Sequence, residues 1–179
     1  MVRIACADGR VVTVERQSLV RSDLRGLNLH RAVLEGADLT GLCGEGVEFR
    51  NAVLSLAKLD GGRLDRARLM GARLERASLR GASLVEAMMN GAQAHGVDLE
   101  GADLTGVNLH GARLQGANLV GADLTDAVMD GAHVEGALFD SATLWPSGFA
   151  PFDAGAVLFG EEQSTYYRTM PTPELFSGE

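Results

Sequence analysis

Residues 101–125 read GADLT GVNLH GARLQ GANLV GADLT, five blocks built on one pattern. Leu stands fourth in every block, a small residue stands two places before it, and Gly opens each block. The pattern continues in both directions, because every fifth residue from Leu19 to Leu144 is large and apolar except Gly44 and Ala94. The chain of 179 residues is therefore dominated by a repeat with a period of five.

A period of five requires a bend inside every repeat. Neither the helical period of 3.6 residues nor the strand period of 2 keeps one face inward at multiples of five. Within each unit, the small residue and the Leu are two positions apart. In a short strand both can therefore point inward, while the residue between them points outward. The two residues that follow, often ending in Gly, supply a turn. Each pentapeptide is thus expected to form one side of a polygon.

These units resemble the pentapeptide-repeat family, whose consensus A(D/N)LxG is matched by Ala37-Asp38-Leu39-Thr40-Gly41, Ala102-Asp103-Leu104-Thr105-Gly106 and Ala117-Asn118-Leu119-Val120-Gly121. The resemblance implies an all-β fold, a right-handed quadrilateral β-helix with four pentapeptides per coil. The repeat would then make about 6.5 coils and, at a strand spacing of about 4.8 Å, a rod roughly 30 Å long. Each Leu is expected to stack on the residue 20 positions away.

We divide the chain into three parts. Residues 1–16 are predicted to form a β-hairpin with an Asp8-Gly9 turn that caps the N-terminal end. Residues 17–146 are the repeat solenoid, in unbroken phase to Leu144. Residues 147–179 are a C-terminal cap, closed by the aromatic residues between 145 and 152, followed by a loosely held tail.

Two positions interrupt the apolar column. At Gly44 we expect Leu42, two places earlier, to fill part of the space that the missing side chain leaves. The glycine-rich segment 41–46 is also the best candidate for a distorted face or a small loop.

The residues that could carry chemistry do not converge in this geometry. His30 and His110 share a side but lie 80 residues, or about four coils, apart. Gly41, Gly44 and Gly46 lack the strand-to-helix context of a phosphate-binding loop. Cys6 and Cys43 have neither metal-ligand nor disulfide-scaffold spacing. We therefore expect no enzymatic activity, no metal and no cofactor.

The location of the protein is predicted from what the sequence lacks. It contains no apolar run of 18 residues and no long apolar stretch at its start. We expect a cytoplasmic protein that does not bind membranes, and the resemblance to the family implies a bacterial origin.

Charge is distributed unevenly along the chain, whose net charge is −8. Residues 1–81 carry +4 and residues 82–179 carry −12. A negative protein is not expected to bind nucleic acid directly, but it can resemble nucleic acid. The sequence also predicts a secondary basic patch made of Arg63, Arg66, Arg68, Arg73, Arg76 and Arg80.

The best-understood members of the family protect DNA gyrase and related type II topoisomerases from antibiotic poisons. The resemblance implies mimicry, in which a rod of about duplex width places carboxylates in the DNA-binding groove of the enzyme. The acidic residues predicted to contact such a partner are Asp98, Glu100, Asp103, Asp123, Asp126, Asp130 and Glu135. A simpler alternative is that carboxylates before the central Leu only give solubility and turn hydrogen bonds.

A competing hypothesis is a structural or interaction scaffold. In that case the Arg-rich coil of one copy meets the acidic half of a second copy, forming a homodimer, or of another protein.

Overall fold

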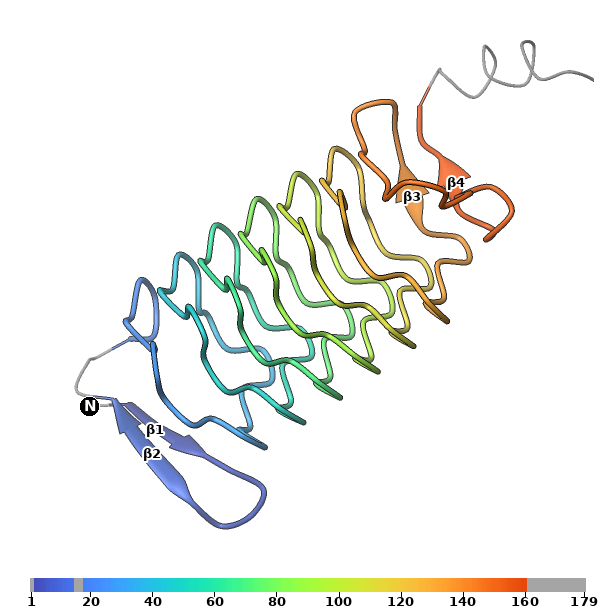
Figure 1. Cartoon of the computed structure of the whole chain (residues 1–179). Coiled ribbons are helices and arrows are strands. Elements are labelled where there is room, and N and C mark those ends of the chain that lie inside the picture. The colour runs from blue at the N-terminus through green and yellow to red at the C-terminus, as the bar shows by residue number, and fades with distance from the viewer. Residues whose placement is uncertain (1, 15–17, 161–179) are drawn as a thin grey trace, which may run out of the picture.

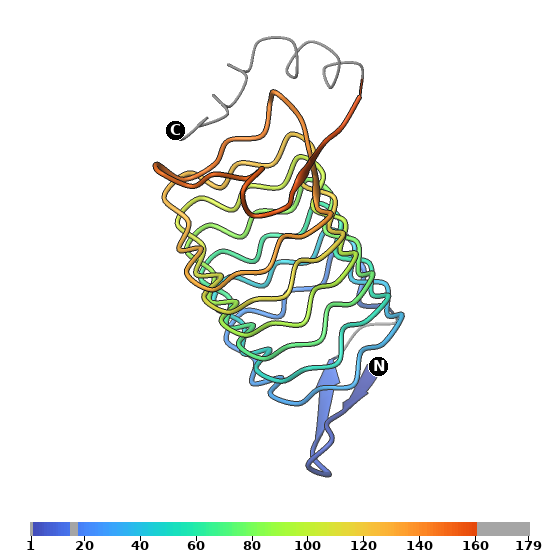
Figure 2. The same ribbon diagram turned by 90° about the vertical axis from the view of Figure 1, so that its right-hand side faces the viewer.

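A computed structural model describes residues 2–14 and 18–160 and shows a four-sided β-helix (Figures 1 and 2). Parallel β-bridges join residues 20 positions apart, from Asp23 with Cys43 to Asn118 with Leu138. Four pentapeptides therefore complete one coil, as expected. We name the four sides by their central residues in one coil: face 1 contains Leu104, face 2 Leu109, face 3 Leu114 and face 4 Leu119.

The core is a stack of central residues with the small residues beside them. Leu104 is 0% exposed and Ala102, two places earlier, is 1% exposed, and this arrangement repeats along the rod. Neighbouring coils are joined by backbone hydrogen bonds such as Leu104 N–H to Asp123 O (2.7 Å). The interior is thus filled by apolar side chains, and each coil is stabilised mainly by contacts with the next one.

A tight turn ends each face. In the turn after Leu99, the N–H of Ala102 donates to the carbonyl of Leu99 (3.0 Å), and Gly101 has a φ of 64°. Asp126 occupies the same place after Leu124 with a φ of 59°. Gly adopts this left-handed conformation freely, and Asp and Asn tolerate it better than most residues.

The segment around Gly44 is regular, so the expected loop or distortion of residues 41–46 is wrong. The bridges from Asp23 through Cys43 to Arg63 are intact. Leu42 fills the space, as predicted: it is 0% exposed, and a Cβ placed on Gly44 would lie 2.6 Å from Leu42 Cδ1. The large and small positions of this repeat are exchanged, which keeps the core filled without a change of backbone.

The N-terminal hairpin pairs strand β1 (Val2–Ala5) with strand β2 (Val11–Val14) in antiparallel register. Strand β1 continues onto the first coil, where Cys6 bridges Ala32 and the N–H of Val33 donates to the carbonyl of Ala5 (2.7 Å). Ile4 and Cys6 are buried against the end of the core. The predicted hairpin is present, although its connection is wider than the two-residue turn expected from Asp8-Gly9.

The predicted phase fails at the last repeat. Asp123 bridges Leu144, a spacing of 21 residues, and Leu144 is 51% exposed whereas Thr143 is 7% exposed. The inward positions are therefore taken by Thr143 and Trp145 instead of Ala142 and Leu144. The cause is a turn at Asp140, whose Oδ1 accepts the N–H groups of Ala142 (3.1 Å) and Thr143 (3.0 Å).

The C-terminal end is filled by aromatic rings. Trp145 stacks on Phe149 with a centroid separation of 5.0 Å, and Phe139 contacts Trp145 and Phe152 edge to face. Strand β3 (Leu138–Phe139) pairs in parallel with strand β4 (Val157–Leu158), so coil pairing on face 4 extends beyond residue 146. The predicted tail, residues 160–179, lies outside the described residues apart from Gly160.

Candidate partner-binding surface

The structure gathers five of the seven predicted acidic residues on two adjoining faces. Asp98 and Glu100 lie on face 4, and Asp103, Asp123 and Asp126 lie on face 1, the next side of the rod. Asp130 and Glu135 lie on faces 2 and 3, because they directly follow Met129 and Val134, the central residues of those faces. We call the five residues on faces 4 and 1 the acidic edge.

Asp103 and Asp123 are direct neighbours across two coils, since they form a parallel bridge. Each carboxylate also accepts a hydrogen bond from its own turn. Asp103 Oδ1 accepts from Thr105 N (3.0 Å) and Thr105 Oγ1 (2.6 Å), and Asp123 Oδ1 accepts from Thr125 N (2.8 Å). These bonds orient the side chains, so the two charges are held in a row along the rod.

Asp103, Asp123 and Asp126 have no ion pair within 4 Å among residues 2–14 and 18–160. Asp98 and Glu100 differ, because Arg80 lies 3.4 Å from Asp98 Oδ2 and 2.7 Å from Glu100 Oε2. Face 1 therefore carries the uncompensated part of the acidic edge, and face 4 carries a part that Arg80 screens.

The six predicted basic residues do not form one patch. They occupy all four faces, because 18 residues span almost one complete coil: Arg63 and Arg66 lie on face 1, Arg68 on face 2, Arg73 and Arg76 on face 3, and Arg80 on face 4. They form a belt around the rod. The predicted secondary basic patch is therefore a belt around one coil and not a patch on one face.

Most of this belt is paired with carboxylates. Besides Arg80, four of its members make an ion pair, at distances of 3.1 Å for Arg63 with Glu45, 2.7 Å for Arg66 with Glu86, 2.6 Å for Arg68 with Glu48 and 3.4 Å for Arg73 with Glu75. Arg76 has no carboxylate within 4 Å in the described part of the chain. Each exposed pair contributes little to stability, but it reduces the local positive charge.

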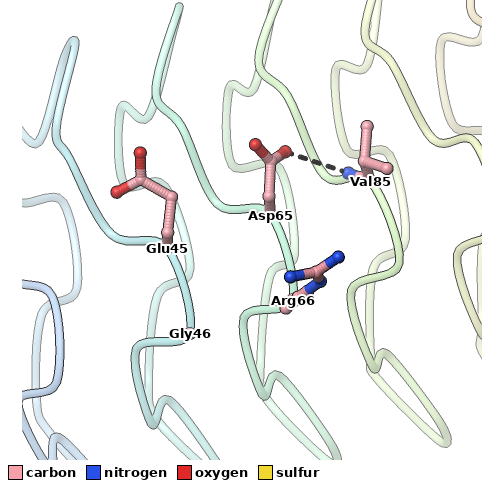
Figure 3. Close-up of a pocket in the computed structure, with 5 residues that line it drawn as sticks. All are labelled: Glu45, Gly46, Asp65, Arg66 and Val85. Atoms are coloured by element: carbon pink, nitrogen blue, oxygen red, sulfur yellow. Dashed lines mark hydrogen bonds between the residues drawn. The ribbon is translucent and has the colours of Figure 1, made fainter.

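A shallow depression lies on face 1 near the belt (Figure 3). Glu45, Gly46, Asp65, Arg66 and Val85 line it. The carboxylate of Asp65 accepts the N–H of Val85 (3.2 Å; Figure 3). It also accepts the hydroxyl of Ser83, and Arg66 pairs with Glu86. Glu45 pairs through Oε1 with Arg63 (3.1 Å), so each of the three charged groups that line the depression already has a partner in the chain.

Hydrogen bonding also lowers the pKa of a carboxyl group that lies outside the acidic edge, that of Asp140. At Asp140, burial acts to raise the pKa, but hydrogen bonds from Gly121 N–H (2.9 Å) and from Ala142 and Thr143 outweigh it and leave the pKa below its usual range. This carboxylate is used to build the last turn. The sequence analysis did not identify it, because its partners depend on the slip in register.

Neither a metal-binding cluster nor a membrane-spanning helix is found among the residues that the structure describes. No three His, Cys, Asp or Glu side chains there come close enough to share a metal ion. The same residues contain no helix that is long and apolar enough to cross a bilayer.

The ion pairs could have been found in the sequence. Five of the six pairs formed by the belt join residues 18 or 20 positions apart, which are neighbours once a coil contains 20 residues. A search for opposite charges at those separations would have paired Arg80 with Asp98 and Glu100.

Comparison with known proteins identifies the repeat. The pattern described as "Pentapeptide repeats" matches in eight copies over residues 15–43, 67–106 and 108–145, more than half of the chain. No curated protein matches the chain significantly.

Several solved structures are similar. A pentapeptide repeat protein from Nostoc PCC 7120 shares 34% identity over 57% of this chain and 84% of its own length, with a TM-score of 0.56. Another from the cyanobacterium Cyanothece 51142 shares 27% identity over 70% of this chain and 89% of its own, with a TM-score of 0.50. Both are described as pentapeptide repeat proteins, whose fold is a right-handed β-helix. The chain belongs to the pentapeptide repeat family.

Proposed function

We propose that this chain is a non-catalytic binding protein whose acidic edge occupies the basic DNA-binding surface of DNA gyrase and so modulates its response to antibiotic poisons. Pentapeptide repeat proteins commonly mediate protein–protein contacts and are generally non-enzymatic. The observation that carries the proposal is the row of Asp103 and Asp123 beside Asp126, three carboxylates on one face without an ion pair among the described residues.

The charge density of the row suits this role. Coils lie about 4.8 Å apart, so bridged carboxylates repeat along the rod at that spacing. Duplex DNA carries one negative charge per about 1.7 Å of its axis, which is within a few-fold of the density on the acidic edge. The half of the chain that contains the edge has a net charge of −12. A positively charged groove of duplex width would therefore attract this end of the rod first.

We also propose a role for the two ends of the rod and a cellular location for the protein. The hairpin and the aromatic segment would act as caps on about 6.5 coils, so that the rod presents its sides to a partner. Contact with gyrase requires the cytoplasmic location that the sequence predicts.

The competing scaffold hypothesis relied on a free basic patch. Because Arg63, Arg66, Arg68, Arg73 and Arg80 already pair with carboxylates of their own chain, fewer cations remain for the acidic half of a second copy. A scaffold of that kind remains the alternative if gyrase does not respond.

The test is gyrase supercoiling and poison-induced DNA cleavage, titrated with the native chain and with Asp103→Asn, Asp123→Asn and Asp126→Asn combined. Asn is chosen because position 126 has a φ of 59°, which Asn tolerates better than Ala. We expect the native chain to reduce cleavage or, at higher dose, supercoiling, and the variant to lose this effect.

A matched variant separates the acidic edge from net charge. Asp130→Asn, Glu135→Gln and Asp153→Asn remove the same three charges elsewhere on the exposed surface. It should keep most of the native effect. If both triple variants fail equally, the row on face 1 has no special role, and if the native chain has no effect at micromolar concentration, gyrase is not the partner.

Arg80 offers a prediction in the opposite direction. Replacing Arg80 with Ala removes the cation beside Asp98 and Glu100 and should make face 4 more negative. We expect about two- to fivefold tighter binding to gyrase at low salt, with a stability change below about 1 kcal/mol because the ion pairs are exposed. Titration at several salt concentrations measures this, and weaker binding by the variant would contradict the charge mechanism.

A further inference from the structure

Strand β2 leaves one edge of the N-terminal hairpin unpaired. The N–H of Cys6 donates to the carbonyl of Arg10 (2.8 Å), and the register pairs Ile4 with Val12 and Ala5 with Val11. Backbone groups point to alternate sides along an antiparallel strand, so those of Arg10 and Val12 face β1. The N–H and carbonyl groups of Val11 and Thr13 therefore face away from it, toward no strand among the described residues.

The opposite side of the hairpin is already used. The β1 carbonyl of Ala5 accepts from Val33, and the N–H of Ala7 donates to the carbonyl of Arg31 (2.8 Å). The hairpin thus extends the ladder of face 3 beyond the first coil, in the order β2, β1, residues 31–33, residues 51–53. Figure 2 shows the hairpin projecting from the N-terminal end of the rod.

The outward surface of this ladder contains a row of apolar side chains. Val11 pairs with Ala5, Val33 bonds to Ala5, and Val33 bridges Val53. Val11 and Val33 are each 47% exposed, Ala5 is exposed and Val53 is half-buried. Strand β2 has the sequence Val-Val-Thr-Val, which contains no Lys or Pro, the residues that commonly protect an edge strand from pairing.

We propose that strand β2 pairs antiparallel with strand β2 of a second copy, joining two rods through their N-terminal ends. Pairing about Val12 places Val11 opposite Thr13 of the other copy, and by symmetry Thr13 opposite Val11. Both residues have outward backbone groups, so the two pairs exchange four hydrogen bonds. Residues that lie directly opposite each other in a sheet have their side chains on the same side. The outward-facing side chains of both copies, such as Val11, therefore lie on the same side of the joined sheet.

A second copy is a better occupant than an unrelated strand because the edge is complementary to itself. One two-fold axis satisfies the outward groups of Val11 and Thr13 in both chains, as in any isologous contact. The strands stack along the rod axis, so the dimer is a longer rod. Its two acidic halves lie at opposite ends, and its two halves of charge +4 meet in the middle.

This arrangement predicts a distinctive salt dependence. Like charges near the junction oppose association, so added salt should leave the dimer unchanged or strengthen it. A dimer held by the Arg belt and the acidic half would instead weaken as salt is added. The contact involves short strands and is below the size of a standard stable interface, so we expect it in the micromolar range.

Sedimentation equilibrium of the full chain across the micromolar range, at low and high salt, tests the proposal. Val11→Lys places a charge on the edge and should raise the dissociation constant about tenfold or more. Val128→Lys is the matched control, because Val128 is an outward-facing valine, 39% exposed, at the other end of the rod. It should dimerise like the native chain.

A second variant and a second readout guard against loss of folding. Thr13→Pro removes an outward N–H and leaves the bonds between β1 and β2 in place, so the melting curve should change little while dimerisation is lost. In hydrogen exchange, protection of the Val11 and Thr13 amides should rise with protein concentration. A chain that stays monomeric, a dimer that salt dissociates, or a dimer that survives both edge variants would overturn the proposal.

Discussion

Replacing Leu42 with Ala should destabilise the solenoid by about 2–5 kcal/mol, although Ala is the residue that most repeats carry at that position. The reason is that Leu42 fills the space of the absent side chain at Gly44 and is 0% exposed. Gly44→Leu alone should also be destabilising, by about 1–3 kcal/mol or more, because its side chain would overlap Leu42 Cδ1. Thermal and denaturant unfolding followed by far-UV circular dichroism measures both.

The double variant is the decisive part of this experiment. Leu42→Ala with Gly44→Leu restores the usual small and large positions, so it should recover much of the stability lost by either change alone. The coupling arises because both side chains compete for one space. Gly62 adds to this site, since a Cβ there would lie 3.3 Å from Leu42 Cδ2.

A control for this cycle is Leu84→Ala, the same chemical change at a central position of regular sequence. It should lose a similar amount, and adding Gly44→Leu to it should give no recovery. If the double variant at positions 42 and 44 loses as much free energy of unfolding as the two single variants together, the exchange of large and small residues does not explain the packing of this coil.

Asp140→Ala should open the last turn of the rod. Its Oδ1 accepts the N–H groups of Gly121, Ala142 and Thr143 and the hydroxyl of Thr143. Thr143 is 7% exposed, and a partly buried donor left without a partner costs about 1–3 kcal/mol. Emission of Trp145, the only tryptophan, should report the loss of packing at this end.

The same residue predicts a pH dependence. Because hydrogen bonds lower the pKa of Asp140 in the folded state, its contribution is present above the unfolded pKa, near 3.9, and is lost as the pH falls through the folded value. The difference in melting temperature between the native chain and Asp140→Asn should therefore shrink below about pH 4.

Asp130→Asn, which removes an exposed carboxylate one face away from Asp126, is the control for the loss of one negative charge. Its melting temperature should stay close to that of the native chain at pH 7. A native chain whose advantage over Asp140→Asn is the same at pH 3 and pH 7 would contradict the role given to the carboxylate.

Much of the fold could be predicted because a strict period leaves few ways to bury the same residue in every repeat. The family, the 20-residue coil, the hairpin and the packing of Leu42 at Gly44 all follow from positions in the sequence. The slip at residues 140–145 could not be predicted in this way. It depends on a carboxylate that bonds to Gly121, almost one coil earlier, and on Trp145 packing against Phe139 and Phe149.

The candidate surface was predicted less completely. The sequence identified the acidic half, but it grouped Asp130 and Glu135 with residues on other faces and treated the belt of arginines as one patch. Side chains five residues apart lie on different faces, whereas those 18 to 20 apart lie side by side. Whether a charged side chain is free or paired therefore depends on which residues lie next to it in the folded chain.

The sequence by itself determined which side chains enter the core from Leu19 to Phe139, because apolar burial at every fifth residue is possible only if the backbone turns once in each repeat. Only the tertiary structure decided where charge remains uncompensated and which strand edge stays open. Ion pairs such as Arg80 with Glu100, and backbone partners such as Val33 with Ala5, join residues that only the stacking of coils brings together. That stacking leaves Asp103 and Asp123 in a row on face 1 and strand β2 without a neighbour on its outer side in the described structure.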